Sequence, residues 1–288
     1  MTRVIDGKAI AADMNERTAK AAGMLRERGV SPALAVVMPA GDESAGWYVR
    51  SIERASARVG IDCRVHQLPP AADSALIISK LGALSDDPAV HAVICQAPLP
   101  GGIALAAVGS AIAVGKDVDG ASPASLGMLA AGLPDAFPAA TAAAVMEILQ
   151  HENVPLRGRR AVVIGRSTVV GKPTALLLLA EDATVTICHS RTQNLADVCR
   201  EADVLVVAAG QPQLVDAGYV APGAVVIDVG VHPAADGLVG DVSTGAVAGV
   251  ASAITPVPGG VGPVTTAQLM SHTIRAARAL AGENGPGR

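Results

Sequence analysis

Apolar residues in the first half of the chain follow two spacings, one typical of helices and one typical of buried strands. Residues 8–28 place apolar side chains on one stripe at helical spacing, and Gly29 follows as a helix terminator. The same analysis predicts helices at 48–59 and 74–84 and buried strands at 33–38 and 90–97. A Gly-, Pro- and Ala-rich region follows, at about 98–141.

A second alternation of strands and helices begins near Ala142. Strands are predicted at 161–164, 184–187, 204–208 and 224–228, and helices at 142–151, 169–180 and 194–201. Such regular alternation is typical of a doubly wound parallel sheet. A last helix is predicted at 266–282, with Gly282 at its end. The fold class is therefore α/β, with two α/β domains, the second of them Rossmann-like.

Composition agrees with a parallel sheet that is covered on both faces. Half of the 288 residues are hydrophobic, whereas aromatic residues make up only 1%. The core must therefore consist of Ala, Val, Leu and Ile, which suits strands buried between two layers of helices.

Charge and cysteine spacing exclude several classes of partner. The net charge is −4 without a basic stripe, so nucleic acid is not an expected partner. No apolar run reaches the length of a membrane span, and the N-terminus lacks a signal-peptide pattern, so we expect a cytoplasmic protein. The four cysteines have no C-x-x-C spacing and the histidines are scattered, which predicts buried thiols and no metal site.

Residues 161–173 have the layout of a nucleotide-binding turn but an incomplete glycine motif. Only Gly165 and Gly171 are present, where a dinucleotide site usually has three glycines. A phosphate is favoured at the N-terminus of the helix that follows. The next strand ends without the acid that grips an NAD ribose, and Arg166, Ser190 and Arg191 could instead surround a 2′-phosphate, which favours NADP. The alternative is that Ser167 only caps the helix beside solvated arginines, and this stretch by itself leaves both open.

Six segments, in this order, resemble the bifunctional methylenetetrahydrofolate dehydrogenase/cyclohydrolase family over essentially the whole chain. They are Ile5-Asp6-Gly7-Lys8, Gln96-Ala97-Pro98-Leu99-Pro100, Lys116-Asp117-Val118-Asp119-Gly120, Gly165-Arg166-Ser167…Val170-Gly171-Lys172-Pro173, Ile227-Asp228-Val229-Gly230 and Thr255-Pro256-Val257-Pro258-Gly259-Gly260-Val261-Gly262-Pro263. The last segment is very specific. The family's NADP loop has this G-R-S-x-x-V-G form, so the resemblance favours a nucleotide at residues 161–173.

The resemblance implies a folate-binding catalytic domain at 1–141, an NADP-binding domain at 142–265, and a C-terminal helix at 266–288 that packs back onto the first domain. Folate and NADP are implied to lie in a cleft between the domains, and a homodimer is implied. The dehydrogenase step transfers a hydride from 5,10-methylenetetrahydrofolate to NADP⁺. The cyclohydrolase step then adds water to the methenyl product.

The resemblance also implies a role for individual residues. Tyr48, Gln96 and Asp119 match the catalytic and folate-binding positions, where Asp119 would accept the pterin N–H groups. Each also has a purely structural interpretation, such as a turn-forming role for Asp119 before Gly120. Pro98, Leu99, Gly259, Gly260 and Pro263 match further substrate-binding positions. The cofactor-binding positions are Gly165, Arg166, Ser167, Gly171, Ser190, Arg191 and Gly230.

Three segments depart from the family pattern. The family's helix motif is Y-V-x-x-K, whose spacing puts the tyrosine and the lysine on one helix face, and here Ile52 stands in the lysine slot. The family's F-H-P-x-N is replaced by residues 121–125, and its P-C-T-P-x-G by residues 138–143. Because isoleucine cannot move a proton, we expect the cyclohydrolase step to be weak or lost.

Three functions are compatible with these departures. The first is an NADP-dependent methylenetetrahydrofolate dehydrogenase with little cyclohydrolase activity, because hydride transfer depends mainly on positioning. The second is a one-carbon transferase that donates the methylene group to another nucleophile in a Mannich-type step without redox chemistry. The third is a non-catalytic folate-binding paralogue.

Overall fold

A computed structural model describes residues 2–39, 43–235 and 237–282. The chain divides into two compact units, and both are made of segments that are distant in sequence. Unit 1 comprises residues 1–11 and 141–265, and unit 2 comprises residues 12–140 and 266–288. Residues 1–11 therefore lie in the unit that contains 141–265, whereas the sequence analysis assigned them to the first domain.

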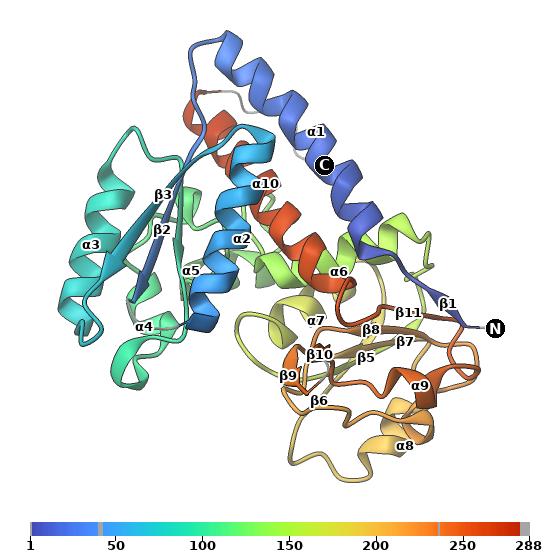
Figure 1. Cartoon of the computed structure of the whole chain (residues 1–288). Coiled ribbons are helices and arrows are strands. Elements are labelled where there is room, and N and C mark those ends of the chain that lie inside the picture. Colours follow the sequence, from blue (N-terminus) through green and yellow to red (C-terminus); the bar gives the residue numbers. More distant parts are fainter. Residues whose placement is uncertain (1, 40–42, 236, 283–288) are drawn as a thin grey trace. The chain divides into compact units, whose positions relative to one another are not determined.

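Unit 1 is built on a six-stranded sheet in the order β1-β11-β8-β7-β5-β6, all of it parallel (Figure 1). Its strands are β1 (Arg3–Val4), β5 (Arg160–Ile164), β6 (Thr184–Cys188), β7 (Val204–Val207), β8 (Val225–Asp228) and β11 (Ala253–Ile254), with a small antiparallel hairpin of β9 (His232–Ala234) and β10 (Gly237–Val239). Its helices are α6 (Ala140–His151), α7 (Gly171–Ala180), α8 (Leu195–Cys199) and α9 (Thr244–Val247). The short strand β1 explains why the N-terminus belongs here, because Arg3 and Val4 pair with β11.

Unit 2 contains a three-stranded parallel sheet in the order β3-β2-β4, made of β2 (Ala33–Pro39), β3 (Asp62–Leu68) and β4 (Ala92–Cys95). Its helices are α1 (Gly7–Glu27), which starts in unit 1, α2 (Glu43–Val59), α3 (Ser74–Asp86), α4 (Leu105–Gly109), α5 (Pro123–Ala130) and most of α10 (Val261–Leu280). Short 3₁₀ turns lie at Pro100–Gly102 and Val114–Lys116 in this unit and at Ala217–Tyr219 in unit 1.

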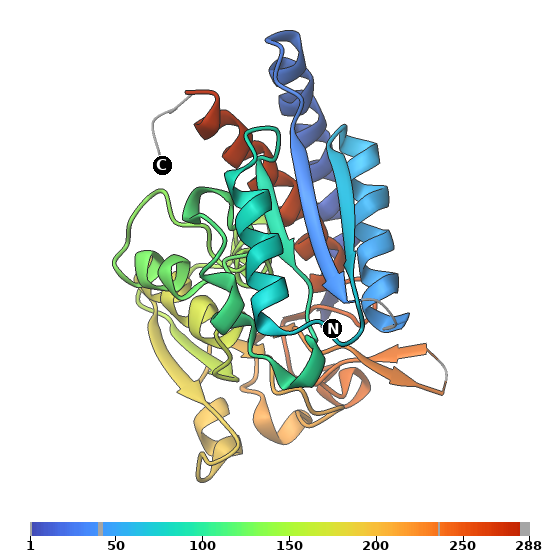
Figure 2. The same cartoon turned by 90° about the vertical axis from the view of Figure 1, so that its left-hand side faces the viewer.

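Strand β2 is buried along its whole length because helices cover both faces of its sheet. Leu34, Val36 and Met38 pack in a core with residues of α1, α2 and α10. Ala35 and Val37 point to the opposite face and pack with α3 and α4. Figure 2 shows α3 in front of this sheet, with α1 and α2 behind it. This layering fixes α2, the helix that carries Tyr48 and Ile52.

Element boundaries differ from the predicted ones mainly at helix starts. Helix α2 begins at Glu43 and not at residue 48, and α10 begins at Val261 and not at residue 266. The strand predicted at 90–97 is shorter, at Ala92–Cys95, because residues 96–99 turn away from the sheet. Strand β3 was not predicted, because its Asp, Arg, His and Gln residues interrupt the apolar pattern on an edge strand.

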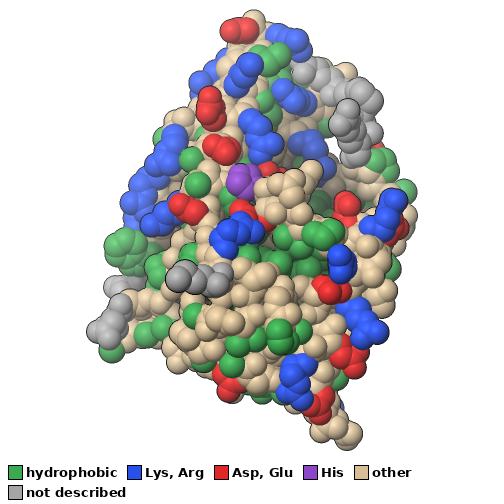
Figure 3. Space-filling model, turned by 90° about the vertical axis from the view of Figure 1, so that its right-hand side faces the viewer, with side chains coloured by type: hydrophobic (Ala, Val, Ile, Leu, Met, Phe, Trp, Pro, Cys, Tyr) green, Lys and Arg blue, Asp and Glu red, His purple; other side chains and the backbone are tan. Residues whose placement is uncertain are grey.

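Over the described residues, no helix combines the length and the apolar character that crossing a bilayer requires. Among the same residues, no group of three metal-binding side chains is arranged around a common point. On the face drawn in Figure 3, acidic side chains lie among Lys and Arg side chains.

Candidate active site

In unit 1, a glycine turn joins β5 to α7 and passes very close to the end of β7. Gly165 has a φ of +127°, and a Cβ at this position would overlap the carbonyl oxygen of Ala208. A Cβ at Gly171 would in turn overlap the carbonyl group of Gly165. The chain therefore needs glycine at both positions. We call this turn, residues 165–171, the glycine cradle, and it lies where the sequence predicted a dinucleotide.

Ser167 takes the capping position that the sequence analysis considered as its alternative role. Its Oγ accepts hydrogen bonds from the backbone N–H groups of Val170, at 3.1 Å, and Gly171, at 3.3 Å. The side chain of Ser167 is nevertheless exposed, as is that of its neighbour Arg166. Capping and ligand binding are compatible here, because a hydroxyl oxygen also carries a proton that it can donate.

Three exposed polar side chains lie where β5 and β6 end. Arg166 follows β5, and Ser190 and Arg191 follow β6, the neighbouring parallel strand. The backbone N–H of Gly165 donates to the carbonyl of Cys188 at 2.9 Å, which ties the two strand ends together. None of the three faces a carboxylate in an ion pair within the described part of the chain. Two guanidinium groups beside a hydroxyl are a suitable partner for a phosphate.

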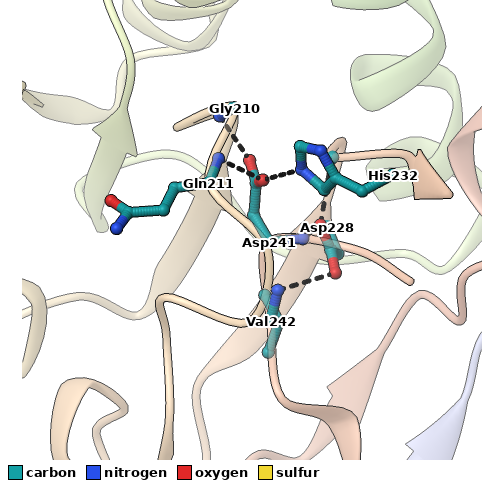
Figure 4. A network of polar contacts seen from close by, with 7 residues as sticks. Gly210, Gln211, Asp228, His232, Asp241 and Val242 are labelled. Atoms are coloured by element: carbon teal, nitrogen blue, oxygen red, sulfur yellow. Dashed lines mark hydrogen bonds and ion pairs between the residues drawn. The ribbon is translucent and has the colours of Figure 1, made fainter. Parts of the chain in front are cut away.

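A network of two buried carboxylates follows β8 in unit 1 (Figure 4). Asp228 ends β8, and its carboxylate accepts hydrogen bonds from the backbone N–H groups of Gly230, Asp241 and Val242, at 2.9 to 3.0 Å. Burial raises the pKa of Asp228 to about 6, and these backbone hydrogen bonds oppose the increase. Gly230, a predicted cofactor-binding residue, lies so close to Asp241 that no side chain would fit.

Asp241 connects this network to the end of the next strand. Its carboxylate accepts from the backbone N–H groups of Gly210, at 3.0 Å, and Gln211, at 2.9 Å, both in the loop after β7. It also lies 2.7 Å from Nε2 of His232. Asp241 and His232 were not predicted from the sequence. The only sequence feature that marked this place was the Gly240-Asp241 dipeptide, which matches no common motif.

In unit 2, Tyr48 and Asp119 lie close together. Tyr48 comes from α2, and Asp119 from the loop after the 3₁₀ turn at 114–116. Burial and the charge of Asp119 both raise the pKa of the Tyr48 hydroxyl. Burial and the neighbouring Asp117 raise the pKa of Asp119 to about 7, although a backbone hydrogen bond from Ala140 opposes this. The protein itself therefore gives little stabilisation to the ionised form of Asp119.

The two segments that depart from the family pattern flank this acid. Asp117 is fully buried and accepts from the backbone N–H groups of Ala121 and Ser122, both at 2.9 Å, and from the hydroxyl of Ser125 at 2.6 Å. Residues 121–125 are therefore tied to Asp117, and Ala140 of the 138–143 stretch bonds Asp119 directly. The departures in sequence consequently lie beside the Tyr48–Asp119 pair.

Helix α10 supports the same loop from behind. Buried His272 lies 2.7 Å from the carbonyl oxygen of Val118 through Nδ1, and 2.9 Å from Nε2 of Gln268 through its own Nε2. Burial lowers the pKa of His272 to about 3, so the ring is neutral, with its proton on Nδ1. The ring also packs edge-on against Phe137 at 5.3 Å. His272 therefore holds the residue next to Asp119 in place.

Ile52 lies in the interior of unit 2. It is 0% exposed and belongs to the core between the sheet and helices α1, α2 and α10, against which Tyr48 is also packed. The slot that carries a lysine in the family motif is thus filled by an apolar side chain one helical turn from Tyr48. The described residues of α2 offer no amine in its place, since Arg50 and Arg54 face away from Ile52 at positions two residues distant.

The remaining predicted residues have different surroundings. Gln96 follows β4, and its amide donates to the carbonyl of Ala97 at 2.7 Å. Pro98 is exposed, but Leu99 is buried in the core beside α3, which gives it a packing role. Gly259, Gly260 and Pro263 belong to unit 1, where the Gly260 carbonyl touches Gly7 at the start of α1 so closely that a Cβ at Gly7 would not fit.

Known proteins that resemble this chain share both its sequence and its fold. Residues 5–119 match the catalytic domain, and residues 139–281 the NAD(P)-binding domain, of tetrahydrofolate dehydrogenase/cyclohydrolase. "Bifunctional protein FolD" of Parafrankia sp. (strain EAN1pec) is 58% identical over 275 residues, which cover 96% of this chain and 99% of that protein.

Two solved structures are similar over nearly the whole chain. The bifunctional FolD methylenetetrahydrofolate dehydrogenase/cyclohydrolase from Campylobacter jejuni has a TM-score of 0.94 at 35% identity, covering 97% of this chain and 99% of that one. The Trypanosoma brucei N5,N10-methylenetetrahydrofolate dehydrogenase-cyclohydrolase, a complex with NADP cofactor and inhibitor, has a TM-score of 0.91 at 37% identity, covering 96% and 98%.

Proposed function

The chain belongs to the tetrahydrofolate dehydrogenase/cyclohydrolase family, and we propose that it is an NADP-dependent methylenetetrahydrofolate dehydrogenase whose cyclohydrolase activity is weak or lost. The dehydrogenase part is supported by family membership and by the glycine cradle of unit 1. The loss of the second activity is carried by one observation, the fully buried Ile52 beside Tyr48.

Unit 1 supplies the groups for the dinucleotide. The turn between Gly165 and Gly171 would carry the phosphates at the start of α7. Arg166, Ser190 and Arg191 would bind the 2′-phosphate that distinguishes NADP from NAD. When bound, NADP⁺ accepts the hydride that leaves the methylene carbon of the folate.

Unit 2 supplies the groups for the folate. Asp119 would accept the pterin N–H groups, and a ligand that donates hydrogen bonds would favour its ionised form. Tyr48 would orient the folate from α2, and Gln96 would contact it from the end of β4. Positioning of this kind is what hydride transfer chiefly needs, so the dehydrogenase step survives without the lysine.

Water addition has a further requirement. A proton must leave the attacking water, and general acid–base catalysis by a side chain contributes about 10²- to 10⁴-fold to such steps. Ile52 has no proton to transfer. Tyr48 is a poor base here, because burial and Asp119 raise the pKa of its hydroxyl.

The test mixes the purified protein with methylenetetrahydrofolate and NADP⁺ and follows NADPH and the methenyl product together. We expect NADPH to form and the methenyl product to decay no faster than without enzyme. Ile52→Lys should restore catalysed decay, and Ile52→Met, an apolar change of similar volume, should not. Catalysed decay in the unchanged protein would disprove the loss of cyclohydrolase activity.

A different outcome would favour the one-carbon transferase. If folate binds but no NADPH forms, the dehydrogenase proposal fails. Transfer of a labelled methylene group to an added amine would then support the transferase, and its absence would leave a binding paralogue. On the basis of the family resemblance, we also propose that the protein is cytoplasmic and forms a homodimer. Sedimentation of the purified protein would check the dimer.

A further inference from the structure

The His232–Asp241 pair stands at the edge of the unit 1 sheet where ligands of doubly wound folds bind. His232 opens the hairpin β9–β10 just after β8, and Asp241 follows that hairpin. Asp241 also binds the backbone of Gly210 and Gln211, in the loop after β7. The pair therefore joins the carboxyl ends of two neighbouring strands (Figure 4).

The hydrogen bonds of this pair assign the protons of the imidazole. Asp241 is completely buried, and its carboxylate accepts hydrogen bonds from the backbone N–H groups of Gly210 and Gln211. A carboxylate can only accept, so Nε2 of His232 carries a proton and donates it across the 2.7 Å contact. With the proton on Nε2, Nδ1 is the ring nitrogen that can accept a hydrogen bond.

Nδ1 has no hydrogen-bond partner among the described residues, and the side chain of His232 is 19% exposed. A buried acid thus orients a ring whose second nitrogen is available at the surface of the site. The same arrangement is found where a second residue fixes a histidine for a ligand.

The strand order decides which part of a dinucleotide this nitrogen would meet. The proposed 2′-phosphate groups Arg166, Ser190 and Arg191 follow β5 and β6, on one side of the glycine turn. Strands β7 and β8 lie on the other side of β5. A dinucleotide that lies across the switch in strand order therefore has its second half over β7 and β8.

We propose that His232, oriented by Asp241, is a binding residue for the nicotinamide half of the dinucleotide, accepting through Nδ1 a hydrogen bond from a carboxamide N–H or a ribose hydroxyl. This proposal rests on the proposed function, because it requires that the cradle binds a dinucleotide. It adds a residue that supports the nicotinamide end, opposite to the arginines that bind the adenosine end.

The experiment compares a whole cofactor with its adenosine half. Calorimetric titration measures the affinity of the full chain for NADP⁺ and for adenosine 2′,5′-bisphosphate, which lacks the nicotinamide. His232→Phe should weaken NADP⁺ binding roughly 2- to 10-fold, the effect of one hydrogen bond, and leave binding of the bisphosphate unchanged. His232→Gln keeps a polar acceptor and should recover part of the loss.

Two results would overturn the proposal. Equal weakening of both ligands by His232→Phe would mean that the ring only supports the fold of the loop. No weakening of either ligand would mean that the ring does not meet the cofactor. His151→Phe is the matched control, because His151 ends α6, before the start of β5 and far from the carboxyl ends of the strands.

The unchanged protein distinguishes this failure from that of the proposed function. If neither NADP⁺ nor the bisphosphate binds to it, the dinucleotide function itself is wrong. If both bind and only the His232 variants behave unexpectedly, the dinucleotide function stands and the assignment of His232 fails.

Discussion

Asp228 in unit 1 and Asp119 in unit 2 are acids with raised pKa values, but they differ in how many backbone N–H groups donate to them. Burial and a neighbouring acid raise the pKa of both, Asp241 beside Asp228 and Asp117 beside Asp119. Three backbone N–H groups donate to Asp228 and oppose the increase, whereas one backbone hydrogen bond, from Ala140, opposes it at Asp119. Asp228 therefore helps to hold the loops after β7 and β8. Asp119 has few hydrogen-bond donors within the protein, and a ligand could supply more.

The two sites therefore differ in how many hydrogen bonds their acids receive from the protein itself. In unit 1, Asp228 and Asp241 hold the loops after β7 and β8 through hydrogen bonds to backbone N–H groups. Unit 2 keeps a poorly compensated carboxyl beside Tyr48, with an apolar side chain where the family motif has an amine. Preorganisation is thus strongest where the dinucleotide would bind, and chemical change is concentrated where the folate would bind.

The largest effect that would test this comparison is on stability. Asp228→Asn should lower the free energy of unfolding by about 1 to 3 kcal/mol, because the amide nitrogen that replaces one carboxylate oxygen leaves at least one of the three buried N–H groups without an acceptor. Urea denaturation followed by circular dichroism measures this. A decrease of less than about 1 kcal/mol in the free energy of unfolding would contradict the role of Asp228 in holding these loops.

The matched change in unit 2 should have the opposite sign. Asp119→Asn should raise the stability of the ligand-free protein by about 1 kcal/mol at pH 8, because it removes a carboxylate that burial destabilises. The folded pKa lies above the unfolded one, so the cost of the ionised acid appears as pH rises from about 4 to 7. The gain from Asp119→Asn should accordingly vanish near pH 4.

Cofactor preference tests the unit 1 site through binding. Arg191→Gln should weaken NADP⁺ binding about 10- to 100-fold, the contribution of a charge-assisted hydrogen bond to a phosphate, and leave NAD⁺ binding unchanged. Arg157→Gln is the control, because Arg157 lies 3.0 Å from Asp182 near the opposite ends of the strands. Equal loss for both cofactors would mean that Arg191 does not bind the 2′-phosphate.

Folate binding tests the unit 2 site through pH. Because Asp119 must be ionised to accept pterin N–H groups, affinity for tetrahydrofolate should fall up to about 10-fold for each pH unit below 7. Anaerobic titrations between about pH 5 and 8 measure this. In Asp119→Asn the affinity should be lower and independent of pH, and an equally steep dependence in that variant would assign the titration to another group.

Much of this site was predictable from residue order. The glycines at 165 and 171 mark a tight turn because only glycine tolerates the local overlap, and the i, i+4 spacing puts Ile52 on the face of Tyr48. The strands of unit 1 were predicted because buried parallel strands are continuous apolar runs. These features depend on neighbours in sequence.

Other features were not predictable because they depend on partners far along the chain. The place of residues 1–11 follows from two backbone pairs with β11, and the role of Leu99 follows from a core that forms beside α3. The start of α10 at Val261 lies inside a Pro- and Gly-rich segment that indicated only a turn.

By itself the sequence determined the α/β class, the tight glycine turn at 165–171 and the apolar residue in the lysine slot, since these follow from spacing and side-chain chemistry. Only the tertiary structure decided that Ile52 is fully buried, that Asp119 stands near Tyr48 with few partners, and that Asp241 orients His232. The physical reason is that burial and hydrogen-bond partners set the charge and the orientation of a side chain, and folding brings those partners together from distant segments.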